Sequence, residues 1–205
     1  MKKRNVTHEN QFNGMPVLQY TKQEIGLDTN ILQCIDDRME DILSRHSKVF
    51  AMRFDVRKPD SIEDEKNEWF SQYQAHFIKK EKRAGYDPAY VAVREVSENG
   101  KVHYHEYLMV NGNKTENIYK HIENANSVMN TMQGLNPGEH SGLIDDCTHD
   151  RNGNPQVNGE MINPKTWEGQ CAQQASFRHA SYLAKDVQKD TPKGTRELFA
   201  SQIKK

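Results

Sequence analysis

The chain has 205 residues, 35% of them hydrophobic and 28% charged, and a formal net charge of −1. This length predicts one domain with a real core. No apolar run approaches the ~18 residues of a membrane span, and the basic N-terminus lacks the apolar region of a signal peptide. We therefore expect no membrane partner and a cytoplasmic location. Three widely spaced cysteines (Cys34, Cys147 and Cys171) suit a reducing compartment better than a disulfide framework.

The near-zero net charge hides an uneven distribution of charges along the chain. Residues 24–41 carry six acids and one base, whereas residues 172–205 carry seven bases and three acids. Such separation is compatible with a local basic surface that binds phosphate, even in a protein that is neutral overall.

Hydrophobic periodicity and turn residues predict the elements in chain order. Residues 1–27 show no clear period and are interpreted as an arm, and Asp28 or Thr29 is expected to cap a helix that ends near Ser47. The elements expected after it are a strand over 49–57, a helix over 61–83, strands over 90–97 and 101–111, a helix over 115–133, a short strand over 142–146, a long loop over 148–170, a helix over 173–190 and a basic tail over 191–205.

The middle of the chain thus has the order β-α-β-β-α-β. This order predicts an α+β fold, with an antiparallel sheet of about 4–5 strands in split βαβ (ferredoxin-like) order. We expect the helices to pack on one face of the sheet and to leave the other face for a functional site. Alternation along the strand 49–57 would turn Arg53, Asp55 and Arg57 toward this free face.

A candidate metal site lies on the hairpin formed by the two strands over 90–111. His103 and His105 would project from the same face of a strand, about 7 Å apart. Two neutral imidazoles suit a shared metal ion, and a nearby carboxylate would complete a set with open coordination positions. Mg²⁺ or Mn²⁺ is the expected ion, because a structural zinc ion normally takes four protein ligands.

The turn of this hairpin decides whether Glu95 is that carboxylate. If the loop has three residues, with Gly100 in the left-handed conformation, Glu95 pairs with His103 and shares its face. A two-residue loop would place Glu95 opposite Tyr104, on the wrong face. The metal site therefore depends on one type of turn.

A candidate nucleophile lies in the segment 173–190. A helix there would gather Tyr182 with Arg178, Lys185 and Lys189 on one face, at ~100° per residue. Cations around a phenol favour its phenolate and attract a phosphate group. The alternative is an exposed tyrosine on a basic, solvated helix face.

The hairpin 94–105 and the sequence Tyr182-Leu183-Ala184-Lys185 together resemble the second and third motifs of the HUH endonucleases, in the replication-initiator branch. The motif sequences are most similar to those of inovirus-type replication proteins of filamentous phages and prophages. The resemblance covers about residues 48–202. It divides the chain into an N-terminal arm and acidic helix (1–47), a nuclease domain (48–202) and a basic tail end (203–205).

The resemblance implies a metal-dependent DNA endonuclease that nicks and joins single-stranded DNA at a replication origin and so initiates rolling-circle replication of a phage or plasmid-like element. Tyr182 would form a 5′-phosphotyrosyl intermediate, and a host helicase or polymerase is a possible partner. The implied residues are Tyr182 and Lys185 for catalysis, Glu95, His103 and His105 for the metal ion, and Arg53, Arg57, Arg178 and Lys189 for the DNA backbone.

Two other functions fit the same residues. One is a tyrosine transposase of the same fold, and the other is a non-cleaving module that binds nucleic acid on a ferredoxin-like sheet. A zinc site of Cys147 and His149 with Cys171 and His179 would have irregular spacing, so these four are interpreted as surface residues.

Overall fold

The computed structural model describes residues 4–20, 25–63, 66–136, 139–150, 152–189 and 191–204. Its helices are α1 (Thr29–Arg45), α2 (Glu68–Arg83), α3 (Ile118–Gln133), α4 (Trp167–Ala180) and the 3₁₀ helix η1 (Ser181–Ala184). The strands are β1 (Val6–Thr7), β2 (Gln11–Phe12), β3 (Met15–Pro16), β4 (Leu27–Asp28), β5 (Val49–Arg57), β6 (Ala89–Val96), β7 (Val102–Asn111), β8 (Ile144–Asp145), β9 (Glu160–Ile162) and β10 (Leu198–Ala200).

The largest sheet has the strand order β10-β6-β7-β5-β8, and β9 also pairs with β5. All of these pairs are antiparallel. The predicted α+β class and antiparallel sheet are thus confirmed. The finer split βαβ order stays a prediction, because β8, its fourth strand, has only two residues.

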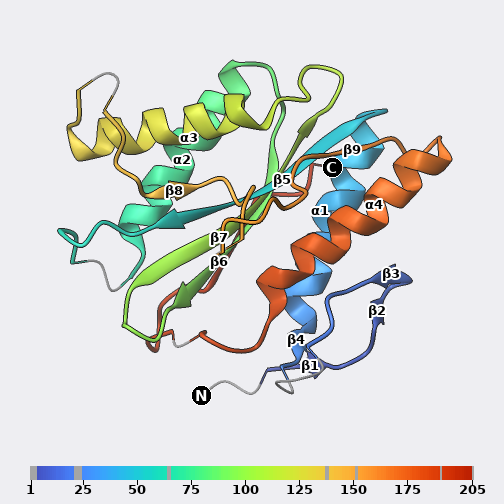
Figure 1. The fold of residues 1–205 in the computed structure, drawn as a ribbon, viewed down its shortest axis with the longest axis horizontal. Helices are drawn as coiled ribbons and strands as arrows, with labels where there is room; N and C mark the ends of the chain where they lie inside the picture. Colours follow the sequence, from blue (N-terminus) through green and yellow to red (C-terminus); the bar gives the residue numbers. More distant parts are fainter. Residues whose placement is uncertain are drawn as a thin grey trace.

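Helices cover both faces of this sheet (Figure 1). Phe50, Phe54 and Tyr104 share a core with α2 and α3, whereas Val49 and Ala51 share another core with α1 and α4. The expectation of helices on one face only is therefore wrong. The physical reason lies in β5, whose first four residues are all buried, so that both of its faces need apolar partners there.

Hydrophobic periodicity placed most helices and strands well. The strand over 49–57 is confirmed, and α1 begins after Asp28, whose side chain accepts a hydrogen bond from the Asn30 amide. Helix α2, however, begins at Glu68 and not at Ser61. Asn67 precedes it in the left-handed conformation, and its side chain accepts a hydrogen bond from the buried Tyr104 hydroxyl.

The long loop expected over 148–170 is only partly a loop. It contains β9 and the start of α4, and Asn158 attaches it to the sheet. The Asn158 side chain accepts from the Arg53 amide at 2.9 Å and donates to the Arg53 carbonyl at 2.6 Å. This side chain replaces a strand partner between β8 and β9, an arrangement that leaves no periodic signal in the sequence.

The expected helix over 173–190 is wrong at both ends. Helix α4 begins at Trp167, where Thr166 caps it, and gives way after Ala180 to η1. Residues 198–200 of the expected tail form β10 and pair with β6. Tyr182 therefore lies in a short 3₁₀ turn, and the expected helix face with Arg178, Lys185 and Lys189 does not form.

The N-terminal region is joined to the rest of the fold. The buried residues of α1 pack with β6, β7 and α4 in one hydrophobic core. The proposed boundary at residue 48 stays a prediction. Among the described residues, every helix is too short or too polar to cross a membrane.

Candidate metal and tyrosine site

The hairpin has the turn that the metal site requires. Gly100 has a φ of 78° and donates its amide to the Ser97 carbonyl, and the Ser97 amide donates to Lys101. Glu95 consequently pairs with His103, as the three-residue loop predicts. The two histidines and the glutamate lie on one face of the sheet.

Their possible ligand atoms lie within 4.8 Å of one another. Glu95 Oε2 is 3.0 Å from His105 Nε2 and 3.8 Å from His103 Nε2. The Glu95 side chain is fully buried, whereas His103 is 20% exposed. Solvent, or a ligand, therefore reaches this cluster from the His103 side.

Asp55 supports the cluster from the neighbouring strand β5. It pairs with His105, and its Oδ1 lies 2.6 Å from His105 Nδ1. A carboxylate on the far nitrogen fixes the ring orientation of a metal-binding histidine. Although burial disfavours charge on both side chains, His105 lowers the pKa of Asp55, and the two carboxylates raise the pKa of His105.

Two lysines neutralise Glu95. Lys185 Nζ is 2.9 Å from Oε2, and Lys189 Nζ is 3.2 Å from Oε1. Burial alone would raise the pKa of Glu95, but the hydrogen bond and charge of His105, together with the two lysines, lower it to about 2. Glu95 is thus an ionised carboxylate held among three cationic or hydrogen-bonding groups.

The Tyr182 phenol lies against this cluster. Lys185 Nζ donates a hydrogen bond of 2.8 Å to its oxygen, and the Arg53 guanidinium lies 4.3 Å from its ring centroid. The rings of Tyr182 and His105 meet edge to face, with centroids 5.0 Å apart. The structure therefore brings the predicted nucleophile, Lys185 and the predicted metal ligands together.

Contacts with the N-terminal segment and with the body of the fold hold η1 in place. Ser181 Oγ accepts from the Leu18 amide and donates to the Arg178 carbonyl. Lys185 forms an isolated bridge with Leu27, and the Asp186 amide donates to the Gly26 carbonyl. The segment that carries Tyr182 is thus fixed on both sides of the phenol.

The four expected DNA-binding residues separate in the structure. Lys189 has a side chain only 1% exposed, so it faces Glu95 and not a DNA backbone, because the helix that would have exposed it ends at Ala180. Arg53 is half-buried over Tyr182 and does not lie on a free face. Arg178 and Arg57 are exposed, and Arg57 is 3.2 Å from Asp145.

Sequence reasoning missed two contributors to this site. Asp55 carried only the signal of strand alternation, and its place opposite His105 depends on the register between β5 and β7. Cys147, interpreted as a surface residue, is buried, and its Sγ accepts from Arg53 at 3.4 Å. Cys171, in contrast, is exposed, as that interpretation expects. In the described part of the chain, the metal-type cluster found is Glu95, His103 and His105.

The fold and the site define an α+β protein in which a tyrosine adjoins a buried cluster of two histidines and one glutamate. A family model described as the YagK/YfjJ C-terminal domain matches residues 7–135. This match covers more than half of the 205 residues, so the chain belongs to that family. No curated protein and no solved structure gives a significant match.

The family match corrects the resemblance to HUH replication initiators, which is wrong as a family assignment. The matched region includes the hairpin with Glu95, His103 and His105 but ends before Tyr182 and Lys185. His-x-His on a hairpin and Tyr-x-x-Lys are short patterns, and unrelated folds can place them side by side. The chemistry of the site must therefore be argued from its geometry.

Proposed function

We propose that the protein breaks and rejoins single-stranded DNA in a metal-dependent reaction, with the Tyr182 phenol as the nucleophile. One observation carries the proposal. Lys185 Nζ lies 2.8 Å from the Tyr182 oxygen and also 2.9 Å from Glu95 Oε2. A single ammonium group thus links a candidate nucleophile to the candidate metal ligands.

In the proposed reaction, the Tyr182 oxygen attacks the phosphorus of a backbone phosphodiester, and the P–O3′ bond breaks. The phenol loses its proton, and the departing O3′ gains one. The products are a 5′-phosphotyrosine and a free 3′-OH. Attack of a 3′-OH on this adduct rejoins the strand, and no nucleoside triphosphate is consumed because one phosphate ester replaces another.

Lys185 and Arg53 supply positive charge where this reaction develops negative charge. The hydrogen bond from Lys185 stabilises the phenolate form of Tyr182. The Arg53 guanidinium, stacked on the same ring, would face the incoming phosphate at close range. Both cations are already held in position by the fold, so little reorganisation is needed on reaction.

The donor set fits a divalent metal ion. Two imidazole nitrogens and one carboxylate converge, and Asp55 holds His105 in the orientation of a ligand. Bound there, the ion would polarise the scissile phosphate and offset its charge. Glu95 would exchange its contact with His105 for the metal. Because imidazole is a poor ligand for Mg²⁺, we favour Mn²⁺ of the two expected ions.

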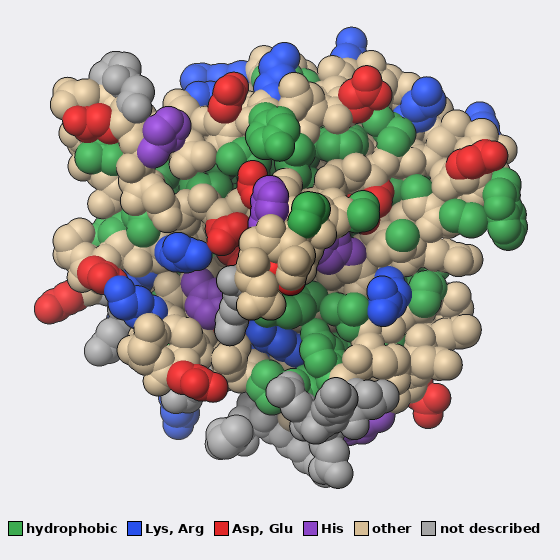
Figure 2. All heavy atoms as spheres, viewed as in Figure 1, with side chains coloured by type: hydrophobic (Ala, Val, Ile, Leu, Met, Phe, Trp, Pro, Cys, Tyr) green, Lys and Arg blue, Asp and Glu red, His purple; other side chains and the backbone are tan. Residues whose placement is uncertain are grey.

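The shape of the site favours single-stranded DNA over duplex DNA. Tyr182 is half-buried beneath Arg53, and a flexible strand reaches such a nucleophile more easily than a stiff duplex does. Acidic and basic side chains are interspersed on the face seen in Figure 2, which argues against extensive nonspecific binding. Arg57 and Arg178 are exposed and would contact the backbone.

The biological setting is less constrained than the chemistry. Initiation of rolling-circle replication at an origin, and contact with a host helicase or polymerase, stay predictions. Transposition by the same chemistry would use the same contacts. A non-cleaving nucleic-acid-binding module would need neither the link between Lys185 and Tyr182 nor the metal ligands.

The test is a search for a covalent adduct. Wild-type protein with Mn²⁺ and a random pool of single-stranded oligonucleotides should yield a protein–DNA band that survives denaturing electrophoresis. Tyr182→Phe should abolish this band and leave DNA affinity within about twofold. Tyr119→Phe, which alters a 61% exposed tyrosine on α3, is the matched control and should form the adduct normally.

Two outcomes would contradict the proposal. An undiminished adduct in Tyr182→Phe would exclude Tyr182 as the nucleophile. Binding of the pool by wild-type protein, with no adduct in Mn²⁺ or Mg²⁺, would favour the non-cleaving module. If wild-type protein does form the adduct, sequencing the trapped DNA shows whether cleavage is site-specific.

A further inference from the structure

Residues 18–20 and 25–27 of the N-terminal region contact the segment that carries Tyr182. The Leu18 amide donates to Ser181 Oγ, and Gly26 exchanges hydrogen bonds with Asp186, its carbonyl accepting from the Asp186 amide and its amide donating to the side chain. Ser181 immediately precedes Tyr182 in η1, and Asp186 immediately follows Lys185, the C-cap of η1. Residues 18–20 and 25–27 therefore belong to the same local structure as the nucleophile.

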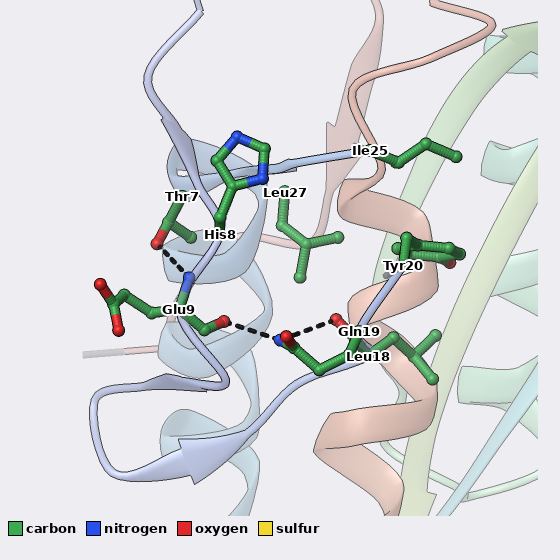
Figure 3. A pocket seen from close by; sticks show the side chains of 8 residues that line it. All are labelled: Thr7, His8, Glu9, Leu18, Gln19, Tyr20, Ile25 and Leu27. Atoms are coloured by element: carbon green, nitrogen blue, oxygen red, sulfur yellow. Dashed lines mark hydrogen bonds between the residues drawn. The ribbon is translucent and has the colours of Figure 1, made fainter. Parts of the chain in front are cut away.

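Tyr20 is the residue of this segment that faces the site. Its hydroxyl is buried and has no hydrogen-bond partner among the described residues. In Figure 3 its ring extends away from His8 and Thr7, toward the strands of the central sheet. On its other side the ring borders a cavity of about 210 Å³ that Leu18, Gln19 and Leu27 also line.

The groups that act electrostatically on the Tyr20 phenol are Tyr182, Arg53 and Glu95. All three belong to the site, although Tyr20 is more than 70 residues from Glu95 in the chain and more than 150 from Tyr182. A buried hydroxyl without a partner costs free energy, and in native proteins such groups are rare. A hydroxyl of this kind, within electrostatic range of Tyr182, Arg53 and Glu95, is suited to bind a ligand.

We propose that Tyr20 is a catalytic residue whose hydroxyl donates a hydrogen bond to an oxygen of the phosphate that Tyr182 attacks. This inference rests on the proposed function, since it names a second contact for the same substrate. Burial, with Tyr182 and Glu95 nearby, raises the pKa of Tyr20 above its ordinary value, so the phenol keeps its proton and acts as a donor. It thereby complements Lys185 and Arg53, which supply charge.

The experiment compares Tyr20→Phe, which removes only this hydroxyl, with Tyr90→Phe. Tyr90 is a half-buried tyrosine on β6 whose ring packs with the α2 and α3 core, so it serves as the matched control. At saturating DNA, Tyr20→Phe should slow adduct formation by about tenfold or more, the value of one hydrogen bond to a charged group. Mn²⁺ affinity and thermal unfolding should match those of Tyr90→Phe. A wild-type rate in Tyr20→Phe would overturn the inference.

A second measurement does not depend on cleavage. Inorganic phosphate is titrated into Mn²⁺-loaded protein by calorimetry, and Tyr20→Phe should weaken its binding about tenfold relative to wild type and Tyr90→Phe. Equal phosphate affinities would overturn the role of Tyr20. If wild-type protein forms no adduct but phosphate binding still requires the Tyr20 hydroxyl, the phosphate contact stands and only the transfer reaction fails.

Discussion

The two faces of the central sheet differ in what they bury. Toward α2 and α3, strands β5 and β7 present mainly aromatic and aliphatic side chains, and the rings of Phe70 and Tyr104 stack with centroids 3.6 Å apart. Toward α1 and α4, the same strands present Arg53, Asp55 and His105 beside Glu95. Buried charges cost more desolvation free energy than they return unless each is closely paired. The second face therefore trades stability for a chemically useful site.

Two buried glutamates sharpen this comparison. Glu95, on the charged face, has two lysines and His105 around it, which lower its pKa to about 2. Glu106, on the aromatic face, accepts a hydrogen bond of 2.7 Å from Gln74, and burial raises its pKa to about 8. The same residue type is thus held ionised on one face and protonated at neutral pH on the other, because of the groups that surround it.

The largest effect is expected on the aromatic face. Phe70→Ala removes a fully buried ring stacked on Tyr104 and should reduce the free energy of unfolding by about 3–5 kcal/mol. Chemical denaturation would measure this loss. Trp167→Ala is the control, because that side chain is 74% exposed and its loss should cost no more than ~0.5 kcal/mol. A loss below about 1 kcal/mol in Phe70→Ala would show that this face does not carry the stability.

The second effect is a pH-dependent gain in the free energy of unfolding when Glu106 is replaced by glutamine. Its folded-state pKa of about 8 exceeds the ordinary value of 4.5, so the unfolded state releases its proton first and stability falls as pH rises from about 4.5 to 8. Glu106→Gln keeps the bond from Gln74 and removes this fall. The variant should gain on the order of 4 kcal/mol over wild type at pH 8, and much less at pH 5. Parallel stability curves for the two proteins would contradict the raised pKa.

The third effect tests the support of the metal cluster on the charged face. Asp55→Asn weakens the contact that orients His105 and should reduce Mn²⁺ affinity by about 10–100-fold, measured by calorimetry. Asp145→Asn is a matched control, because Asp145 lies on β8 opposite Asp55 and outside the cluster. Equal losses in both variants would point to a general charge effect and not to the orientation of His105.

The smallest effect on stability is expected at the exposed rim of the charged face. Arg57 is 57% exposed and bridged to Asp145, so Arg57→Gln should change the free energy of unfolding by no more than ~0.5 kcal/mol. If Arg57 contacts DNA, the same variant should reduce the salt dependence of single-strand binding by about 0.7 in the logarithmic slope. An unchanged slope would remove Arg57 from the DNA contacts.

Sequence patterns were most informative where neighbouring residues determine the structure. The register of the hairpin follows from Gly100 and the pairing of Ser97 with Lys101, and the sequence predicted that Glu95 meets His103 if this loop has three residues. The strand 49–57 and helix α1 likewise follow from local periodicity and a cap. Local steric and hydrogen-bonding preferences suffice for such features.

The contacts that complete the site were not predictable in this way. The pairing of Asp55 with His105 and the approach of Lys189 to Glu95 join residues 50 and 94 positions apart. The segment containing Asn158, which binds β5 through a side-chain amide, carries no periodic signal. A helical pattern also placed Tyr182 in a helix that ends before it. Each of these features depends on which distant groups become neighbours when the chain closes.

The sequence by itself determined that this protein has an antiparallel sheet and a hairpin on which His103 and His105 share one face. It placed Glu95 beside them only for a three-residue loop, which is the loop that the structure shows. Only the tertiary structure decided that both faces are covered and that Lys185 links Tyr182 to Glu95. The physical reason is the range of the interactions. A turn sets the register of its own strands, whereas the partners of a buried charge come from the whole fold.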